Sequence, residues 1–136
     1  MALTLRGEVL IDGAAEGPLF RLGKPISFWG GVDPVTGRIT DPRHPDHNAS
    51  VAGTVLALTE SIGSSSSSAV MLELLSKGLS PRALLMGRPD AILTLGVVVA
   101  REMDMGSIPV LQVDVGRLPA SGTVTITEGG EISFAE

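Results

Sequence analysis

The chain has 136 residues, a length typical of one domain with its own hydrophobic core, and we expect residues 1–136 to fold as a single unit. Its net charge is -5 and its ten lysines and arginines are scattered, so no basic face is available to bind the phosphates of a nucleic acid. The chain has no cysteine, which excludes disulfides and leaves no thiolate for a zinc or iron–sulfur site, so any such metal needs another chain.

The composition favours a compact, sheet-rich α/β domain over a helical bundle, because seventeen glycines and nine prolines accompany an aliphatic core pattern. Three phenylalanines and one tryptophan leave little aromatic surface for stacking on bases or sugars. Met1–Val9 lacks the continuous apolar core of a signal peptide, and no stretch reaches the length of a membrane-spanning helix. We therefore expect a cytoplasmic protein with no membrane partner.

The start of the chain predicts one strand and one loop. Leu3–Ile11 alternates well enough for a strand, which Asp12 and Gly13 end with a turn. Residues Gly13–Gly23 mix small residues with a Gly-Pro pair and few bulky apolar side chains, so we expect a loop or a short irregular crossing there.

The stretch Pro25–Pro34 is unusual because Gly30 and Gly31 directly follow an aromatic pair and Asp33 precedes the closing proline. One interpretation is a strand that ends in a bulge, with Trp29 as a core plug. The other places Gly30, Gly31 and Asp33 at the rim of a pocket, because glycines let a backbone approach a ligand closely. The sequence leaves both interpretations open.

Both histidines lie in a polar loop, Asp41–Asn48, which follows a predicted hairpin tip and short strand at Val35–Thr40. His44 and His47 could bind a metal, but a proline-rich loop lacks the helix or strand that orients metal ligands. We therefore expect no metal site here, and we expect His44 to hydrogen-bond a neighbouring loop or a partner chain. Asn48 suits a left-handed turn.

The middle of the chain predicts a strand–loop–helix unit. Val51–Leu58 suits a central strand, and a helix over Ala69–Lys77 should end at Gly78. Between them Gly63 is followed by five serines, a composition that also suits a linker. We favour the start of a helix, because apolar residues at helical spacing follow at once. Free helix N–H groups beside these hydroxyls would form an anion-binding surface.

The remainder of the chain alternates predicted strands and helices. Asp90 precedes an apolar helical segment and is a favourable N-cap. The predicted elements are a buried strand at Ala83–Met86, a helix over Ala91–Met103, a strand at Pro109–Val113 and a closing hairpin of Gly122–Ile126 and Ile132–Phe134.

A specific family resemblance begins with the run Ser27–Pro34, Ser-Phe-Trp-Gly-Gly-Val-Asp-Pro. The other residues that carry it follow in order: Thr36-Gly37, Asp41, His44-Pro45, Gly53 and Gly63-Ser64-Ser65. In this order and spacing the chain resembles the small, swivelling subunit of aconitase X along essentially its whole length.

The resemblance implies a swivelling β/β/α domain that closes over a larger partner subunit. Enzymes of this family dehydrate hydroxy acids, which are cis-3-hydroxy-L-proline in many bacterial members and mevalonate 5-phosphate in archaeal ones. Their iron centre, a cluster or a single ion, lies in the large subunit, in agreement with the lack of cysteine here. We therefore expect a hydro-lyase component that binds no cofactor itself and is active only with an aconitase X large subunit.

The resemblance also implies roles for site residues. In the wider aconitase superfamily the serine directly after the glycine acts as the base, and it corresponds to Ser64; a helix N-terminus would help to stabilise its alkoxide. Related sequences often carry arginine where this chain has Ile62, so the grip on a substrate carboxylate would come from the partner, Arg43 or Arg88. The residues expected to bind substrate are Gly30, Gly31, Asp33, His44, Gly63 and Ser65.

Other functions stay open at this point. The same architecture occurs in phosphohistidine carriers, in which His44 would carry the phosphate, although no phosphoacceptor-like loop surrounds it. A regulatory or scaffold domain that kept the fold is the stronger alternative, given Ile62. Net negative charge slightly favours cis-3-hydroxy-L-proline over a phosphorylated substrate. Met1 and the self-contained strand pattern favour a large subunit encoded as a separate chain.

Overall fold

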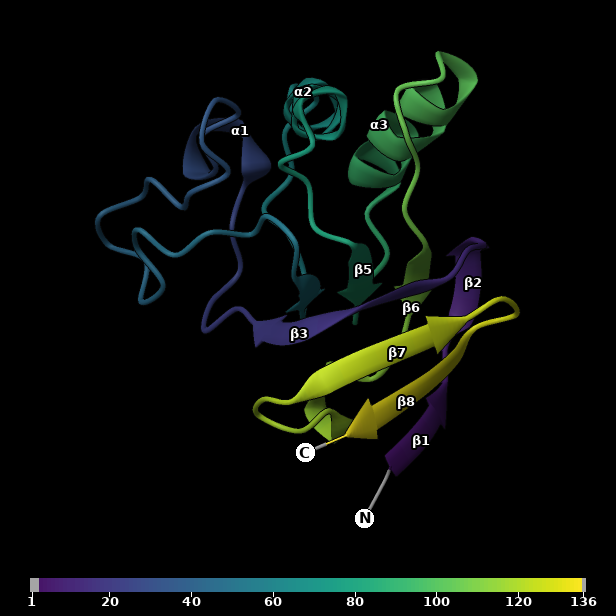
Figure 1. Cartoon of the computed structure of the whole chain (residues 1–136). Helices are drawn as coiled ribbons and strands as arrows, with labels where there is room; N and C mark the ends of the chain where they lie inside the picture. Colours follow the sequence, from purple (N-terminus) through teal and green to yellow (C-terminus); the bar gives the residue numbers. More distant parts are fainter. Residues whose placement is uncertain (1–2, 136) are drawn as a thin grey trace.

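The computed structural model describes residues 3–135, which form one strongly curved sheet with the α-helices gathered on one side of it (Figure 1). These residues contain eight strands in the order β1-β8-β7-β3-β4-β5-β6-β2, the α/β architecture expected from the sequence. The strands are β1 (Leu3–Arg6), β2 (Glu8–Ile11), β3 (Ala15–Arg21), β4 (Val55–Leu58), β5 (Ala83–Met86), β6 (Val110–Gln112), β7 (Thr123–Thr127) and β8 (Glu131–Ala135). The helices are α1 (Phe28–Gly31), α2 (Ser67–Lys77), α3 (Ala91–Glu102) and the 3-10 turn η1 (Val115–Arg117).

The sheet is nearly closed because its two edge strands are consecutive in the sequence. β1 pairs with β8 and β2 pairs with β6, and only Gly7 separates them. The Gly7 N–H donates to the carbonyl of Gly130 at 2.9 Å, and a Cβ on Gly7 would lie 3.1 Å from the Gln112 carbonyl oxygen. The prediction of one strand over Leu3–Ile11 is therefore wrong, because the chain breaks at Gly7 to reach two different partners.

Strand β3 joins the antiparallel part of the sheet to the parallel part. Its first half pairs antiparallel with β7, and its second half pairs parallel with β4, which continues in parallel to β5 and β6. The expected loop over Gly13–Gly23 is wrong, because pairing with two distant strands outweighs the weak strand propensity of this Gly-Pro segment. Gly17 in its middle leaves room for the Gly53 carbonyl oxygen, which a Cβ would approach to 3.0 Å.

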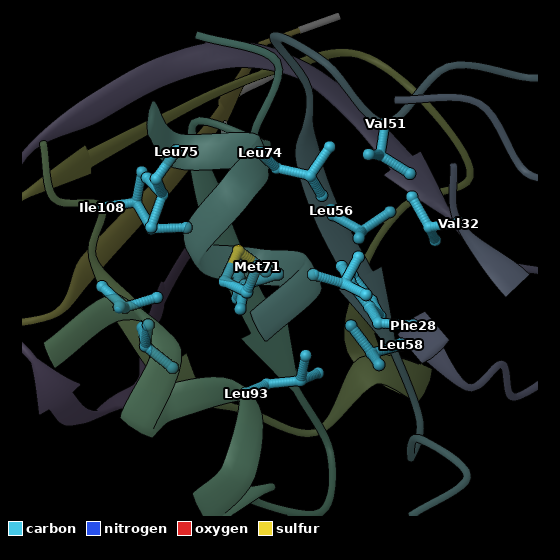
Figure 2. Close-up of a cluster of buried hydrophobic side chains, with 14 of the residues drawn as sticks. Phe28, Val32, Val51, Leu56, Leu58, Met71, Leu74, Leu75, Leu93 and Ile108 are labelled. Atoms are coloured by element: carbon cyan, nitrogen blue, oxygen red, sulfur yellow. The ribbon is translucent and has the colours of Figure 1, made fainter. Parts of the chain in front are cut away.

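Two apolar cores lie on opposite faces of the parallel strands. The first is packed between these strands and helices α2 and α3, and Figure 2 shows Leu56, Met71, Leu74 and Leu93 converging there. The second is enclosed by the curved sheet itself and includes Leu85 from β5 together with side chains from β7 and β8. Alternate residues of β4 and β5 enter the two cores, so these short strands are buried on both faces.

Helices α2 and α3 confirm the predicted cap residues. The α2 helix ends at Lys77 with Gly78 in the left-handed region at φ 71°, and the Asp90 carboxylate accepts hydrogen bonds from the N–H groups of Ile92 and Leu93. Helix α3 stops at Glu102, one residue before the predicted end. Among residues 3–135, no helix is both long and apolar enough to cross a membrane.

The predicted strand Val51–Leu58 is shorter in the structure and comprises only β4. The residues before it form a turn in which Gly53 has φ 73°, a conformation that a strand does not contain. The other predicted strands match β5, β6, β7 and β8 to within about one residue at most ends.

Candidate active site

The candidate active site lies at the carboxyl ends of the parallel strands β3, β4 and β5. Three loops follow these strands: the Trp29 loop (residues 22–54), the serine loop (residues 59–66) and the Arg88 loop (residues 87–90). In open α/β sheets ligands bind at this edge, because the loops there converge and helix N-termini point toward the ligand. The residues expected to act in catalysis lie mainly in the first two loops.

The Trp29 loop is not the predicted strand. Ile26 forms a single parallel bridge with Ser61, after which the chain enters the short helix α1, in which Gly30 has φ 80°. Phe28 is fully buried and fills the core, whereas Trp29 is 61% exposed. The core-plug interpretation of Trp29 is therefore wrong, and the neighbouring Phe28 has that structural role.

Two cavities lie on either side of Trp29 and Gly30. The Trp29 cavity has a volume of about 390 Å³ and includes Ser27, Gly31, Thr40 and Ile62 in its wall. A second, mainly apolar cavity of about 420 Å³ lies beside it and includes Val32, Asp33 and Val70. Gly30, Gly31 and Asp33 thus lie at cavity walls, as the pocket-rim interpretation expected.

Asp33 and Thr40 also stabilise the shape of this loop. One Asp33 carboxylate oxygen accepts a hydrogen bond from the Val35 N–H at 2.8 Å, and the Thr40 hydroxyl donates to the Gly30 carbonyl at 3.0 Å. The predicted hairpin over Val35–Thr40 is present as a turn, closed by the Asp33 N–H donating to the carbonyl of Arg38. Thr40 and Ser27 were not predicted to line a cavity.

The serine loop places its hydroxyls in different environments. Ser64 precedes the helix and is partly buried, and its Oγ accepts a hydrogen bond from the Ser66 N–H at 3.3 Å. Ser65 is exposed. Within the described residues, the N–H groups of Ser64 and Ser65 donate to no other protein group. Within the first turn of α2, the N–H groups of Ser67 and Ala69 donate to the carbonyls of Ser64 and Ser66. The serine run does start a helix, as expected, but the unpaired N–H groups of Ser64 and Ser65 lie in the loop before the helix and not in the helix itself.

Ser67 connects the serine loop to the Trp29 loop. It is the first residue of α2, it is 2% exposed, and its Oγ accepts a hydrogen bond from the Trp29 N–H at 3.3 Å. The next hydroxyl, that of Ser68, donates back to the Ser65 carbonyl at 3.2 Å. In a run of identical residues the sequence carries no signal that distinguishes the buried Ser67 from its neighbours.

The Arg88 loop and the serine loop together form a third cavity, of about 280 Å³. Ser61, Gly63, Arg88 and Asp90 line it, and the Ser61 hydroxyl donates to the Asp90 carboxylate. Ile62 lines the Trp29 cavity and Gly63 lines this Arg88 cavity, and Ser64 is the next residue along the chain.

The structure places His44 in the interior of its own loop. His44 is only 6% exposed. Its Nε2 contacts the Lys24 carbonyl at 2.9 Å, and its Nδ1 accepts a hydrogen bond from the Asp46 N–H at 3.0 Å. A carbonyl can only accept, so the tautomer with a proton on Nε2 satisfies both contacts. The predicted hydrogen bond to a neighbouring loop is confirmed, and neither nitrogen is left for a substrate or a phosphoryl group. Asn48 has φ 71°, the expected left-handed conformation.

The donor groups of this chain do not fit an iron site. The sequence has no cysteine, and residues 3–135 bring together no group of three or more His, Asp or Glu side chains that could hold a metal. The pair His44 and His47 therefore does not form a metal site with its acidic neighbours, and no chemical step in this chain is assigned to iron.

Comparisons with known proteins agree with this architecture. The family model described as the aconitase X swivel domain matches residues 4–134. The chain is 42% identical to cis-3-hydroxy-L-proline dehydratase of Hypocrea jecorina, over 96% of this chain and 22% of that protein, so it spans about a fifth of that relative. It is 36% identical to the phosphomevalonate dehydratase small subunit of Thermococcus gammatolerans, over 98% of this chain and 99% of that subunit.

The fold matches a solved structure over its full length. A chain of aconitase X from Thermococcus kodakaraensis, determined in its holo-form, superposes with a TM-score of 0.88 at 32% identity, covering 98% of this chain and 99% of that one. The family match and this superposition both confirm the resemblance that the Ser27–Pro34 run and the Gly63–Ser65 segment indicated. This chain therefore belongs to the aconitase X swivel domain family.

Proposed function

We propose that this chain is the small subunit of an aconitase X-type dehydratase and that Ser64 removes the proton from the substrate carbon next to the carboxylate. The observation that carries this proposal is the position of Ser64, directly after residues that line two cavities and in front of α2. The full-length similarity to dehydratase small subunits supports the reaction class and a large-subunit partner.

The chemistry requires a strong base at this point. The proton next to a carboxylate is weakly acidic, so a serine can remove it only as an alkoxide, which nearby dipoles must stabilise. The Ser66 N–H, which donates to Ser64 Oγ at 3.3 Å, and the N-terminus of α2 supply such dipoles. The Ser64 alkoxide takes the proton and becomes a hydroxyl, and the electron pair of the broken C–H bond forms a carbon–carbon double bond. The hydroxyl on the neighbouring carbon leaves as water after it takes up a proton from the large subunit or from solvent.

Mevalonate 5-phosphate is the better supported substrate. The relatives that match this chain from end to end are phosphomevalonate dehydratase small subunits. This replaces the first choice made from net charge, because total charge says little about the field inside a cleft. In mevalonate 5-phosphate the hydroxyl is on the carbon next to the one that loses the proton, as the mechanism requires.

A second candidate substrate is cis-3-hydroxy-L-proline. It is favoured by the 42% identity with a dehydratase of this hydroxy acid, which exceeds the identity with the small subunit of Thermococcus gammatolerans. It carries the same arrangement of carboxylate, acidic carbon and neighbouring hydroxyl, so Ser64 would have the same role.

The experiment mixes the purified chain with the large subunit encoded in the same genome and measures water elimination from both compounds. We expect the complex to dehydrate mevalonate 5-phosphate and each subunit alone to be inactive, because the metal and part of the substrate contacts belong to the large subunit. Activity of the isolated chain, or a complex that dehydrates neither compound, would overturn the proposal.

A further inference from the structure

We infer that Arg88 binds the carboxylate of the substrate, in the cavity that it lines together with Ser61 and Gly63 of the serine loop. This assignment rests on the proposed dehydration at Ser64. It answers the question raised by Ile62, which leaves the serine loop without a cation of its own. Both candidate substrates carry a carboxylate on the carbon that loses its proton, so the cation that holds it must lie close to Ser64.

The backbone around Arg88 is held tightly against the serine loop. The Gly87 N–H donates to the Leu58 carbonyl at 3.0 Å, and the Arg88 N–H donates to the Thr59 carbonyl at 2.8 Å. A Cβ on Gly87 would lie 2.8 Å from that same Thr59 oxygen, so only glycine allows this close approach. These contacts fix the position of the Arg88 backbone directly after β5. Arg88 and Gly63 line the same cavity.

The Arg88 guanidinium is largely free to bind an anion. Its side chain is 79% exposed, and its ion-pair partner is Glu60, at 3.5 Å, which is itself about half exposed. Such a pair contributes little and exchanges readily for a better acceptor. A carboxylate that approaches Ser64 can take up two parallel N–H donors of the guanidinium, which is the favoured geometry for arginine.

Both oxygens of the acidic side chain in this cavity, that of Asp90, already accept hydrogen bonds within the chain. One Asp90 oxygen accepts from the N–H groups of Ile92 and Leu93, and the other accepts from the Ser61 hydroxyl. Asp90 is occupied as the cap of α3, so Glu60 is the carboxylate that competes with the substrate for the Arg88 guanidinium.

Several other arginines are engaged elsewhere or lie outside the cavities of the site. The guanidinium groups of Arg21, Arg38 and Arg82 donate to the carbonyls of Leu118, Asn48 and Glu16, respectively. Arg43 is exposed on the loop beyond Pro42 and does not line the three cavities described above. Arg88 is thus the arginine that shares a cavity wall with the serine loop.

This assignment orients the substrate. With its carboxylate at Arg88 and its acidic carbon at Ser64, the rest of the molecule extends toward the Trp29 cavity, where Ile62 is 58% exposed and provides an apolar wall. An apolar residue there suits the methyl-bearing carbon of mevalonate or the ring methylenes of hydroxyproline, and it explains how the site works with isoleucine in place of arginine.

The test measures KM and kcat of the complex with its large subunit for Arg88→Gln. We expect KM to rise roughly ten- to hundredfold, as the loss of a charge-assisted bidentate contact predicts, and kcat to fall as well, because proton removal pushes charge onto the carboxylate.

Two further variants and a control sharpen this test. Arg88→Lys should recover part of the loss, and Glu60→Gln should lower KM about twofold by removing the carboxylate that competes for Arg88. Arg101→Gln, an exposed arginine in the last turn of α3, is the matched control and should change KM by less than about twofold.

Mevalonate as a competitive inhibitor distinguishes the two anionic groups of the phosphorylated substrate, because it keeps the carboxylate and lacks the phosphate. Its inhibition constant should rise in parallel with the KM of the substrate in Arg88→Gln. An active wild-type complex whose KM is unchanged in Arg88→Gln, or raised in Arg43→Gln instead, would overturn the assignment alone, as would unchanged mevalonate inhibition. A wild-type complex inactive on both substrates would overturn the proposed function and this assignment with it.

Discussion

The serines of the loop before α2 and the serines at the start of α2 differ in what their hydroxyl groups contact. Ser64 and Ser65 lie in the loop before the helix, and their N–H groups are free of protein acceptors among the described residues. Ser67 and Ser68 lie inside α2, and their hydroxyls bond to the backbone of Trp29 and Ser65. Burial and hydrogen-bond partners thus distinguish chemically identical side chains: we expect the loop serines to act on the substrate and the helix serines to stabilise the structure. The predictions below test this division.

The largest effect is expected for Ser64→Ala in the complex. Turnover should fall on the order of a hundred- to ten-thousand-fold, because a positioned base is lost and water substitutes poorly for it in a closed cleft. KM should change little if the hydroxyl acts in the chemical step. The free energy of unfolding of the isolated chain should change by no more than about 1 kcal/mol, measured by urea denaturation. A large loss of stability would instead indicate that Ser64 has a structural role, like the serines at the start of α2.

Trp29→Ala should weaken association with the large subunit. An exposed tryptophan beside two cavities resembles the aromatic anchors of protein interfaces, whose loss costs about 2 kcal/mol or more of binding free energy. Titration calorimetry with the large subunit measures this loss. Leu95→Ala, which removes an exposed apolar side chain on α3, is the control. Equal losses for both variants would argue against a partner-facing role for the Trp29 loop.

Ser67→Ala should affect stability more than chemistry. The substitution leaves the Trp29 N–H without its acceptor, which costs about 1–2 kcal/mol at a part-buried site. Turnover of the complex at a temperature well below the melting transition should fall by less than about tenfold, since the loop remains in place. Thermal denaturation of the chain and a parallel turnover assay test the two parts. Unchanged stability would mean that the Ser67 bridge does not hold the loop.

The smallest effect is expected for Ser68→Ala. Its hydroxyl makes a local hydrogen bond to the Ser65 carbonyl, three residues back, and alanine is a better helix former, so stability should stay within about 0.5 kcal/mol. Turnover should be unchanged. A drop in turnover comparable to that of Ser64→Ala would contradict the distinction between the loop serines and the helix serines.

Local signals made much of this fold predictable. Asp90 at the start of α3 and Gly78 at the end of α2 act through neighbouring N–H groups and carbonyls, so their roles can be seen in the sequence. The break at Gly7 and the strand β3 depend on partners far along the chain, which no local pattern reveals.

The candidate site was predictable where a motif was specific. The Ser27–Pro34 run and Gly63–Ser65 led to the family, and the role of Ser64 as the base stays a prediction. The burial of Phe28 in place of Trp29 depends on which side of the loop faces the core. The proximity of Arg88 to Gly63 depends on β4 and β5 being neighbours in the sheet, which only the fold establishes.

The central claim is that Ser64 is the base, and its most direct test compares the serines in one complex. Turnover of mevalonate 5-phosphate is measured for Ser64→Ala, Ser67→Ala and Ser68→Ala, each assayed at the same interval below its own melting temperature. We predict that Ser64→Ala alone loses about a hundredfold or more, while the other two stay within about tenfold of the wild type. Equal and mild losses for all three would show that the serine run is purely structural and would contradict the proposed mechanism.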